Sequence, residues 1–158
     1  MFYVLFSLLI IAADQLSKVA VVANIPREGI VPVWDGLLHL TYRQNTGMAW
    51  SLLEGGRWFF VVITVLAFVL LFYILKKKWI THPTGYAAIA MIAGGALGNF
   101  IDRVRMGYVV DMIAVEFIDF PVFNVADCFI VCGGILLAVF VLFFDKPAGK
   151  EPDHDPAD

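Results

Sequence analysis

Long apolar segments alternate with polar connections along the whole chain. Four of these segments are long enough, at about 17 residues or more, to cross ~30 Å of hydrocarbon as helices. They cover residues 1–22, 58–75, 85–103 and 127–144. The third reaches this length only if its helix continues to Asp102 and Arg103. The pattern therefore predicts four membrane-spanning helices.

The connection 24–57 has a different pattern. Its part VPVWDGLLHLTYRQNTGMAW is rich in β-branched and aromatic residues, lacks a helical period and carries a turn signal at Asp35–Gly36. We expect a short β-hairpin or sheet lying on the membrane surface, with an irregular loop as the alternative. Gly55–Gly56 then predicts a turn before the second helix.

Composition supports a membrane protein. Of 158 residues, 61% are hydrophobic and 16% charged, which is little charge for a soluble domain of this size. The expected fold is an all-α bundle of four transmembrane helices with a small extracytoplasmic β-sheet or loop element. We expect residues 1–158 to form a single membrane domain. The net charge of -3 gives no electrostatic reason to expect a nucleic-acid partner, and membrane lipids are the expected surroundings.

Three lysines fix the predicted orientation. They occur in KKKWITH, the short connection between the second and third segments, and short basic connections stay in the cytoplasm. Both termini are then cytoplasmic, including the acidic tail 145–158, which we expect to be disordered. The connections 24–57 and 104–126 are extracytoplasmic. With this orientation the polar residues inside or beside the helices gather near the outer interface: Asp14, Lys18, Asn99, Asp102, Arg103, Asn124 and Asp127.

The end of the third segment combines small and polar residues. Gly94 and Gly98 form a row of small residues that permits close helix approach. Asn99, Asp102 and Arg103 share one helix face. Asp102 and Arg103 could simply cap the bundle as an ion pair, or they could line a site. For Arg103 we favour binding of a carbonyl-rich or anionic group, because its planar fork can donate to two oxygens.

Asp14 and Lys18 repeat this helical spacing in the first segment. Pairing reduces the cost of placing charges in a bilayer, so we expect a structural pair that shapes the rim of a site. Direct chemistry by Lys18 is the less favoured alternative. In the outer connection, Asn45 and Gly47 are typical of a tight turn. The functional alternative is that Asn45 and nearby backbone groups pair with an extended peptide, and spacing alone does not decide between the two.

Two aspartates occupy similar settings, Asp111 in YVVD and Asp127 in NVAD. Asn124 shares a face with Asp127 if the fourth helix begins there. Two carboxyl groups close together would hold one proton between them. The ionised member can then activate a water while the protonated member donates to a carbonyl oxygen, which hydrolyses a peptide without a metal. The alternative is that both aspartates only cap structural elements at the interface.

Other chemistry has little support. No GxSxG motif or phosphate-binding loop is present, and the three histidines are scattered. Cys128 and Cys132 lack nearby histidines, and we interpret them as small core residues rather than metal ligands, so no metal or cofactor is expected. A proton-coupled transporter is the main rival function, because carboxylates inside membranes often mark ion paths. A non-catalytic scaffold is a third possibility.

Five blocks together resemble bacterial lipoprotein signal peptidases, the type II signal peptidases. They are DQLSK (14–18), NTGMAW (45–50), GGALGNFIDR (94–103), VVD (109–111) and FNVAD (123–127). The resemblance implies an aspartyl endopeptidase of the bacterial cytoplasmic (inner) membrane. Such an enzyme removes the signal peptide from a diacylglyceryl-modified prolipoprotein at the outer membrane face, without a cofactor.

The resemblance also implies roles for particular residues. The catalytic pair falls on Asp111 and Asp127. Substrate-binding positions fall on Asn45, Gly47, Asn99, Arg103 and Asn124. Positions that support the site fall on Asp14, Lys18 and Asp102. Met48 and Cys128 depart from the usual residues of the family, which have a small residue and a serine at these positions.

Overall fold

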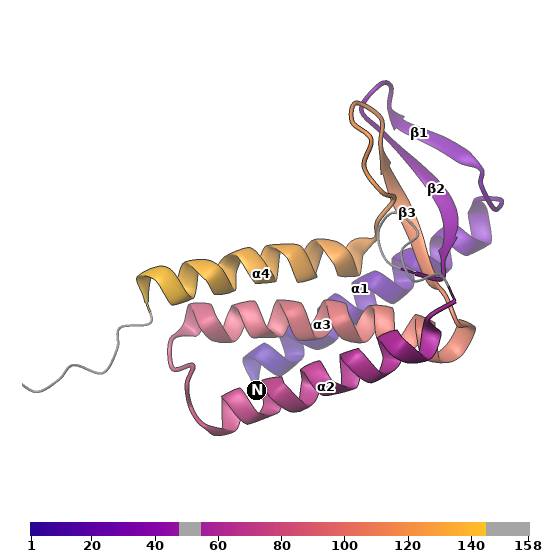
Figure 1. The fold of residues 1–158 in the computed structure, drawn as a ribbon. Coiled ribbons are helices and arrows are strands. Elements are labelled where there is room, and N and C mark those ends of the chain that lie inside the picture. The colour runs from indigo at the N-terminus through magenta and orange to yellow at the C-terminus, as the bar shows by residue number, and fades with distance from the viewer. Residues whose placement is uncertain (48–54, 145–158) are drawn as a thin grey trace, which may run out of the picture.

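The computed structural model describes residues 1–47 and 55–144, so Met48 and the tail 145–158 lie outside the described residues. Within this part, four helices are long and apolar enough to cross a membrane. The helices are α1 (Phe2–Asn24), α2 (Arg57–Lys76), α3 (Pro83–Met106) and α4 (Val125–Phe143). The strands are β1 (Ile30–Trp34), β2 (Leu38–Asn45) and β3 (Val109–Val115). The predicted fold class is confirmed (Figure 1).

Helix α3 is the centre of the bundle and packs mainly against α4 and α1. It continues past Asp102 and Arg103 to Met106, as its apolar length requires. Gly107 ends it in a left-handed conformation, with φ of 85°, and its N–H bonds to the carbonyl of Arg103. This is the usual glycine termination of a helix, because a side chain would strain the backbone there. The end of α3 is therefore fixed next to the sheet.

Small residues on α3 allow its neighbours to approach closely. A Cβ atom added to Gly94 would lie 2.9 Å from the Cβ of Ile10 and 3.1 Å from the carbonyl oxygen of Ser7, both on α1. A Cβ atom on Gly95 would collide with the carbonyl oxygen of Ala126 on α4. The row of small residues therefore serves helix packing, as its spacing predicts.

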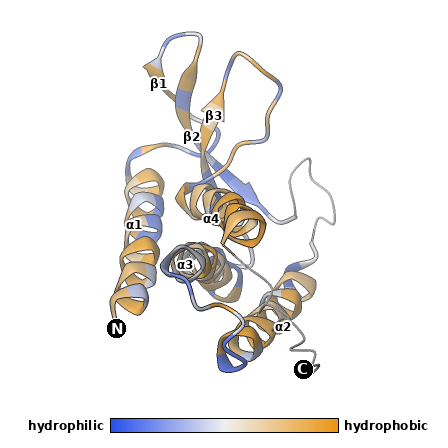
Figure 2. Cartoon of the chain, turned by 90° about the vertical axis from the view of Figure 1, so that its left-hand side faces the viewer, coloured by the Kyte–Doolittle hydropathy of each residue, from blue (hydrophilic) through white to orange (hydrophobic). Residues whose placement is uncertain are grey.

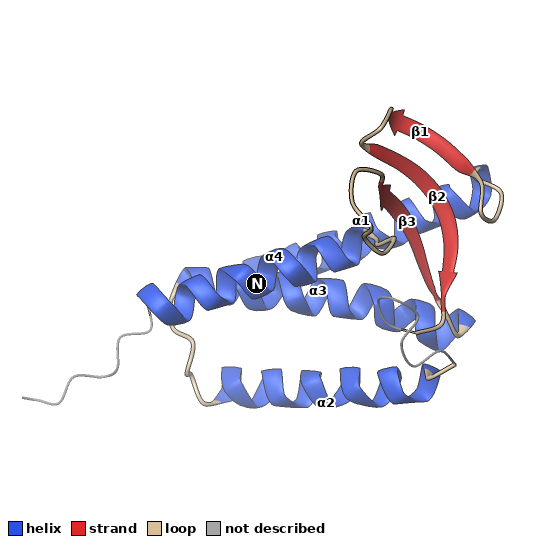
Figure 3. Cartoon of the chain, turned by 45° about the horizontal axis from the view of Figure 1, so that its top comes forward, coloured by secondary structure: helices blue, strands red, loops and turns tan. Residues whose placement is uncertain are grey.

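The three strands form one antiparallel sheet in the order β1-β2-β3. The β1–β2 hairpin turns where Asp35–Gly36 predicts it, and Gly36 has a φ of 72°. Strand β3 was not expected, because 104–126 was treated as a connection. It pairs with β2 so that Arg43 lies opposite Asp111. Figure 3 shows the sheet at one end of the helices, so β3 brings Asp111 to that end.

Helix α2 has the fewest buried residues of the four helices. Within α2, which is described throughout, Phe60 alone is buried. Figure 2, a view along the helices, shows α3 between α2 and α1. The remaining side of α2 is apolar and exposed, as expected of a surface that faces lipid. Helix α2 therefore forms one side wall of the bundle rather than part of its core.

The buried charged residues of the described helices lie at the sheet end of the bundle. They are Asp14, Lys18 and Asp102. A transporter would place polar groups through the full membrane depth, so this distribution does not favour the rival function. One expectation about the core is wrong. Cys132 is exposed on the outside of α4, because its position on the helix points away from α3, while Cys128 is half-buried and both thiols are free.

Candidate active site

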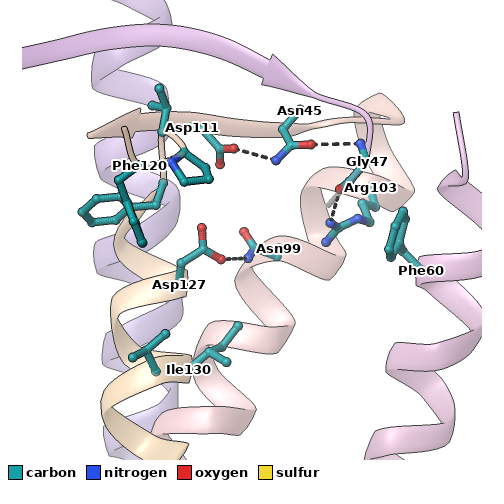
Figure 4. Close-up of a pocket in the computed structure, with 13 residues that line it drawn as sticks. Asn45, Gly47, Phe60, Asn99, Arg103, Asp111, Phe120, Asp127 and Ile130 are labelled. Atoms are coloured by element: carbon teal, nitrogen blue, oxygen red, sulfur yellow. Dashed lines mark hydrogen bonds between the residues drawn. The ribbon is translucent and has the colours of Figure 1, made fainter. Parts of the chain in front are cut away.

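A cavity of about 410 Å³ lies between the sheet and the adjacent ends of α2, α3 and α4. Figure 4 shows its polar side chains converging from two strands and two helices. Six of the predicted site residues line it: Asn45, Gly47, Asn99, Arg103, Asp111 and Asp127. The fold therefore brings together residues that are up to 82 positions apart in the sequence, from 45 to 127.

Asp111 lies on β3 and is only 3% exposed. Its Oδ2 accepts a hydrogen bond of 2.8 Å from the amide of Asn45, and its Oδ1 accepts one of 2.7 Å from the amide of Asn124. Burial raises the pKa of Asp111 to about 6 from an ordinary value of 3.8; the bond from Asn45 opposes the rise, and the charge of Asp127 adds to it. The pKa of Asp111 therefore lies well above that of an ordinary aspartate.

Asp127 is held in the first turn of α4 by a capping box. The side-chain oxygen of Asn124 accepts from the N–H of Asp127 at 2.9 Å, and Asp127 Oδ2 accepts from the N–H of Asn124 at 3.2 Å. This arrangement satisfies backbone groups at the helix start and fixes the side-chain orientation. Asp127 Oδ1 also accepts a bond of 2.8 Å from the amide of Asn99. Helix initiation and site construction therefore use the same two residues.

Two asparagines connect the two carboxyl groups. The amide nitrogen of Asn124 donates to Asp111 and also to Asn99 Oδ1 at 3.2 Å, and Asn99 in turn donates to Asp127. Asn124 is completely buried. In Figure 4 the carboxyl groups of Asp111 and Asp127 point into the same space. The pair shares one cavity and one hydrogen-bond network, although the residues come from a strand and a helix.

Arg103 occupies the opposite wall of the cavity. Its guanidinium carbon lies 4.7 Å from the ring centre of Phe60 on α2, a cation–π distance. One nitrogen donates weakly, at 3.4 Å, to the carbonyl oxygen of Gly47. Asn45 accepts from the N–H of Gly47 at 2.9 Å, which forms the predicted tight turn while the same side chain contacts Asp111. The structure therefore shows Asn45 in the turn, and its pairing with an extended peptide stays a prediction.

Asp14, Lys18 and Asp102 lie behind the cavity and are buried. Asp14 and Lys18 form the expected pair, with 2.9 Å between Oδ2 and Nζ. Asp102 pairs with the same ammonium group at 2.8 Å. Arg103 points away to Gly47 and Phe60 instead. Of the two alternatives for Asp102 and Arg103, the ion pair between them is therefore wrong, because the two side chains have different partners.

The apolar lining of the cavity was not predicted from the sequence. These residues are Phe60, Phe120, Pro121, Val122, Phe123, Ile130 and Val131. The run FPVF directly before Asn124 was a usable signal of this lining. Four consecutive apolar residues in an extracytoplasmic connection are expected to pack against another part of the protein or to line a cavity. Phe60 could not be found this way, because it is one of many apolar residues in α2.

The arrangement supports acid–base chemistry on a bound carbonyl. Charging two carboxyl groups in one cavity is costly, so such a pair is able to hold one proton. Within residues 1–47 and 55–144 no group of three or more His, Cys, Asp or Glu side chains could hold a metal ion. The donor side chains that line the cavity are the amides of Asn45 and Asn99 and the guanidinium group of Arg103, which suit oxygen-rich ligands.

Comparison with known proteins places this geometry in a family. The sequence profile of the family described as "Signal peptidase (SPase) II" matches residues 6–143. A protein named lipoprotein signal peptidase from Enterococcus faecalis is 45% identical over 94% of this chain and 92% of its own length. One of the same name from Clostridioides difficile is 42% identical over 92% of this chain and 98% of its own length.

Solved structures agree with the sequence comparison. A structure described as a bacterial membrane enzyme superposes with a TM-score of 0.86 at 32% identity and covers 95% of this chain and 94% of that chain. A second one with the same description gives a TM-score of 0.82 at 33% identity, covering 92% and 94%. With its two aspartates in one cavity at the end of four membrane-spanning helices, this chain belongs to the signal peptidase II family of bacterial membrane proteases.

Proposed function

We propose that this protein is an aspartyl endopeptidase that removes the signal peptide from diacylglyceryl-modified prolipoproteins. The observation that carries the proposal is the pair of carboxyl groups, Asp111 and Asp127, which point into one buried cavity and are joined through Asn99 and Asn124. The relatives named lipoprotein signal peptidase support the class of substrate.

In the proposed mechanism the pair holds one proton. The ionised carboxylate removes a proton from a water molecule as the water attacks the scissile carbonyl carbon. The protonated partner donates its proton to the carbonyl oxygen and becomes ionised. When the tetrahedral intermediate collapses, this carboxylate takes a proton back from a hydroxyl group of the intermediate, and the carboxyl group that took the proton of the water gives it to the leaving amine, so the pair again holds one proton. Asn99 and Asn124 keep the two groups oriented without adding charge, so the pair can exchange its proton during each cycle.

The remaining lining suits a lipid-modified peptide. Arg103 would donate to the carbonyl oxygens of the diacylglyceryl group. Its contacts with Phe60 and Gly47 hold the planar guanidinium group in position for this. Asn45 and the backbone at Gly47 would hold the extended peptide. The lining continues to Val131, which is 60% exposed on the outside of α4. The acyl chains can therefore remain in the membrane while the scissile bond reaches the aspartates.

We further propose that the site lies at the extracytoplasmic face of the cytoplasmic membrane, with both termini in the cytoplasm. The three lysines at 76–78 lie at the end of α2 and directly after it, at the bundle end opposite the sheet, and short basic connections stay in the cytoplasm. Membrane lipids and the prolipoprotein are the expected partners. A substrate anchored by its acyl chains would then present its cleavage site at the depth of the acids.

The test is cleavage of a purified diacylglyceryl-modified prolipoprotein in lipid nanodiscs. Asp111→Asn and Asp127→Asn should each lower kcat by about 10³-fold or more, because either change removes a group needed for proton transfer. The matched control is Asp119→Asn, which changes an exposed carboxylate in the β3–α4 connection and should leave kcat unchanged. Wild-type cleavage by either test variant would rule out the two-aspartate mechanism. Equal cleavage of the unmodified precursor would rule out the proposed substrate class.

A further inference from the structure

Lys18 occupies an unusual position for a lysine in a membrane protein. It is 3% exposed, and its Nζ lies 2.9 Å from Asp14 Oδ2, 2.8 Å from Asp102 Oδ2 and 2.9 Å from Asn99 Oδ1. An ammonium group has three N–H donors, so all of them are used. Lys18 is not among the residues that line the cavity. It therefore acts, if it acts on the reaction, through its partners.

The two carboxylates that Lys18 joins each hold a backbone N–H group. Asp14 Oδ1 accepts from the N–H of Ala126 at 2.9 Å, and Asp102 Oδ2 accepts from the N–H of Val110 at 3.2 Å. Ala126 directly precedes Asp127, and Val110 directly precedes Asp111. One ammonium group thus connects, through two equivalent links, the backbone positions next to both members of the aspartate pair.

These links connect four elements of the fold. Asp14 belongs to α1 and holds the start of α4, while Asp102 belongs to α3 and holds β3. Gln15 strengthens the connection by donating to Asp14 at 3.2 Å and to Asp102 at 2.9 Å. Without the cation, two buried carboxylates would face each other and one of the links would have to change.

We propose that Lys18 is a positioning residue that fixes the separation of the two aspartates by tying the backbone before Asp111 to the backbone before Asp127. This inference rests on the proposed function, because it assigns a role within the two-aspartate mechanism. A lysine that only stabilised α1 against α3 would need one carboxylate partner, and neither partner would need to hold the backbone beside an aspartate of the pair.

The charge of Lys18 also reaches the aspartates themselves. The charged groups that face it are Asp14 on its own helix, Asp102 on α3, Asp111 on β3 and Asp127 on α4. Among them, Asp111 lies outside the helices, and the positive charge of Lys18 lowers its pKa. Loss of this charge should raise the pKa of Asp111 further. The pH range in which the pair holds one proton would then move to higher pH.

The central experiment compares Lys18→Met with wild type in nanodiscs. We expect kcat to fall by about 10²-fold, the cost of a misplacement of about 1 Å, with KM changed less than about threefold because Lys18 does not line the cavity. The pH–rate profile should move to higher pH. Amide hydrogen exchange should accelerate at both Val110 and Ala126.

The control is Ser7→Ala, which removes a different α1–α3 hydrogen bond, from Ser7 Oγ to the carbonyl of Ala90 at 2.9 Å. It should leave kcat and the pH profile unchanged.

A second set of variants keeps the test decisive if Lys18→Met does not fold. Lys18→Arg retains the charge but cannot place three donors as an ammonium does, so it should fold and still lose kcat. Asp102→Asn combined with Lys18→Arg should be no worse than the poorer single variant, because both act through one connection. The proposal would be overturned by any of three results. These are an unchanged kcat in Lys18→Arg, additive losses of kcat in the double variant, and faster amide hydrogen exchange at only one of Val110 and Ala126. If Asp111→Asn is inactive while Lys18→Met keeps wild-type kcat and pH profile, this inference fails and the proposed function stands.

Discussion

At the scale of single residues, the carboxyl groups of Asp111 and Asp127 are held in position by hydrogen bonds from neutral amides. Asn45, Asn99 and Asn124 each donate to a carboxylate at 2.7–2.8 Å. An amide fixes the position of a carboxylate without adding charge, whereas a lysine in direct contact would hold it ionised at all working pH values. The pair can therefore keep one proton and still be rigid. Each amide also influences when that proton leaves.

Replacing Asn45 by alanine should move the pH dependence of the reaction upward. The hydrogen bond from Asn45 lowers the pKa of Asp111, which burial has raised to about 6. Removing the bond raises this pKa, so the shared proton is lost at higher pH and the alkaline limb of kcat/KM moves to higher pH. The profile measured with lipidated substrate checks this. Gln44→Ala, which removes a bond to Tyr42 on the same strand, is the control. A shift of the limb to lower pH would contradict the assignment of Asp111.

The residues of the site could be found from the sequence more readily than their partners. Asp111 and Asp127 are conspicuous because charged side chains rarely border apolar segments without a reason. Their approach was not predictable, since it depends on the register of β3 against β2. The link between Lys18 and Asp102 joins positions 84 apart, from 18 to 102, and local spacing shows only the pair with Asp14.

At the scale of elements, apolar length predicted the four helices and the Asp35–Gly36 turn predicted the hairpin. Strand β3 was missed for a physical reason. Five of its seven residues, 109–112 and 114, are buried, so the segment lacks the alternation that distinguishes a half-exposed strand from any other apolar run. The strand pairs with β2 along one edge, packs against α1 and α3, and forms a bridge from Ile113 to Phe123. The site depends on this one unpredicted element.

The contact between α3 and α4 should be sensitive to a single methyl group. In Gly95→Ala the new Cβ would collide with the backbone carbonyl of Ala126, which cannot move without shifting the start of α4. Overpacking of this kind costs about 1–3 kcal/mol, so the thermal unfolding midpoint and kcat should both fall. Gly134→Ala on α4 is the control, since its Cβ would meet no atom within 4 Å. Equal unfolding midpoints for the two variants would show that α3 and α4 are not held at this distance.

At the scale of the whole molecule, the chain consists of a connected core and one lightly attached helix. The hydrogen bonds that hold the acids involve α1, α3, α4 and the sheet. Helix α2 reaches this end through Arg57, which donates to the carbonyl of Val104, and through Phe60 beneath Arg103. A cation at the last turn of α3 is favourable because the helix dipole is negative there. These two contacts set the position of the cavity wall.

Arg57→Met should therefore weaken substrate binding more than chemistry. Losing one hydrogen bond of about 1 kcal/mol would let the wall move and raise KM by about fivefold, with kcat reduced by less. The measurement is steady-state cleavage of the lipidated substrate in nanodiscs. Lys76→Met, at the far end of α2, is the control and should leave KM unchanged. A large fall in kcat at constant KM would mean that Arg57 acts on the acids instead.

The light attachment of α2 also bears on how an inhibitor would lose its effect. An inhibitor that binds against α2 would contact a helix on which most side chains face lipid. Many substitutions in α2 could therefore weaken inhibitor binding while the enzyme keeps its activity. A compound that takes its hydrogen bonds from Asn99 and Asn124 would be different. A substitution of either asparagine that prevented inhibitor binding would also remove a hydrogen bond that holds Asp111 or Asp127. Inhibitors that remain effective should therefore be sought on the side of the cavity away from α2.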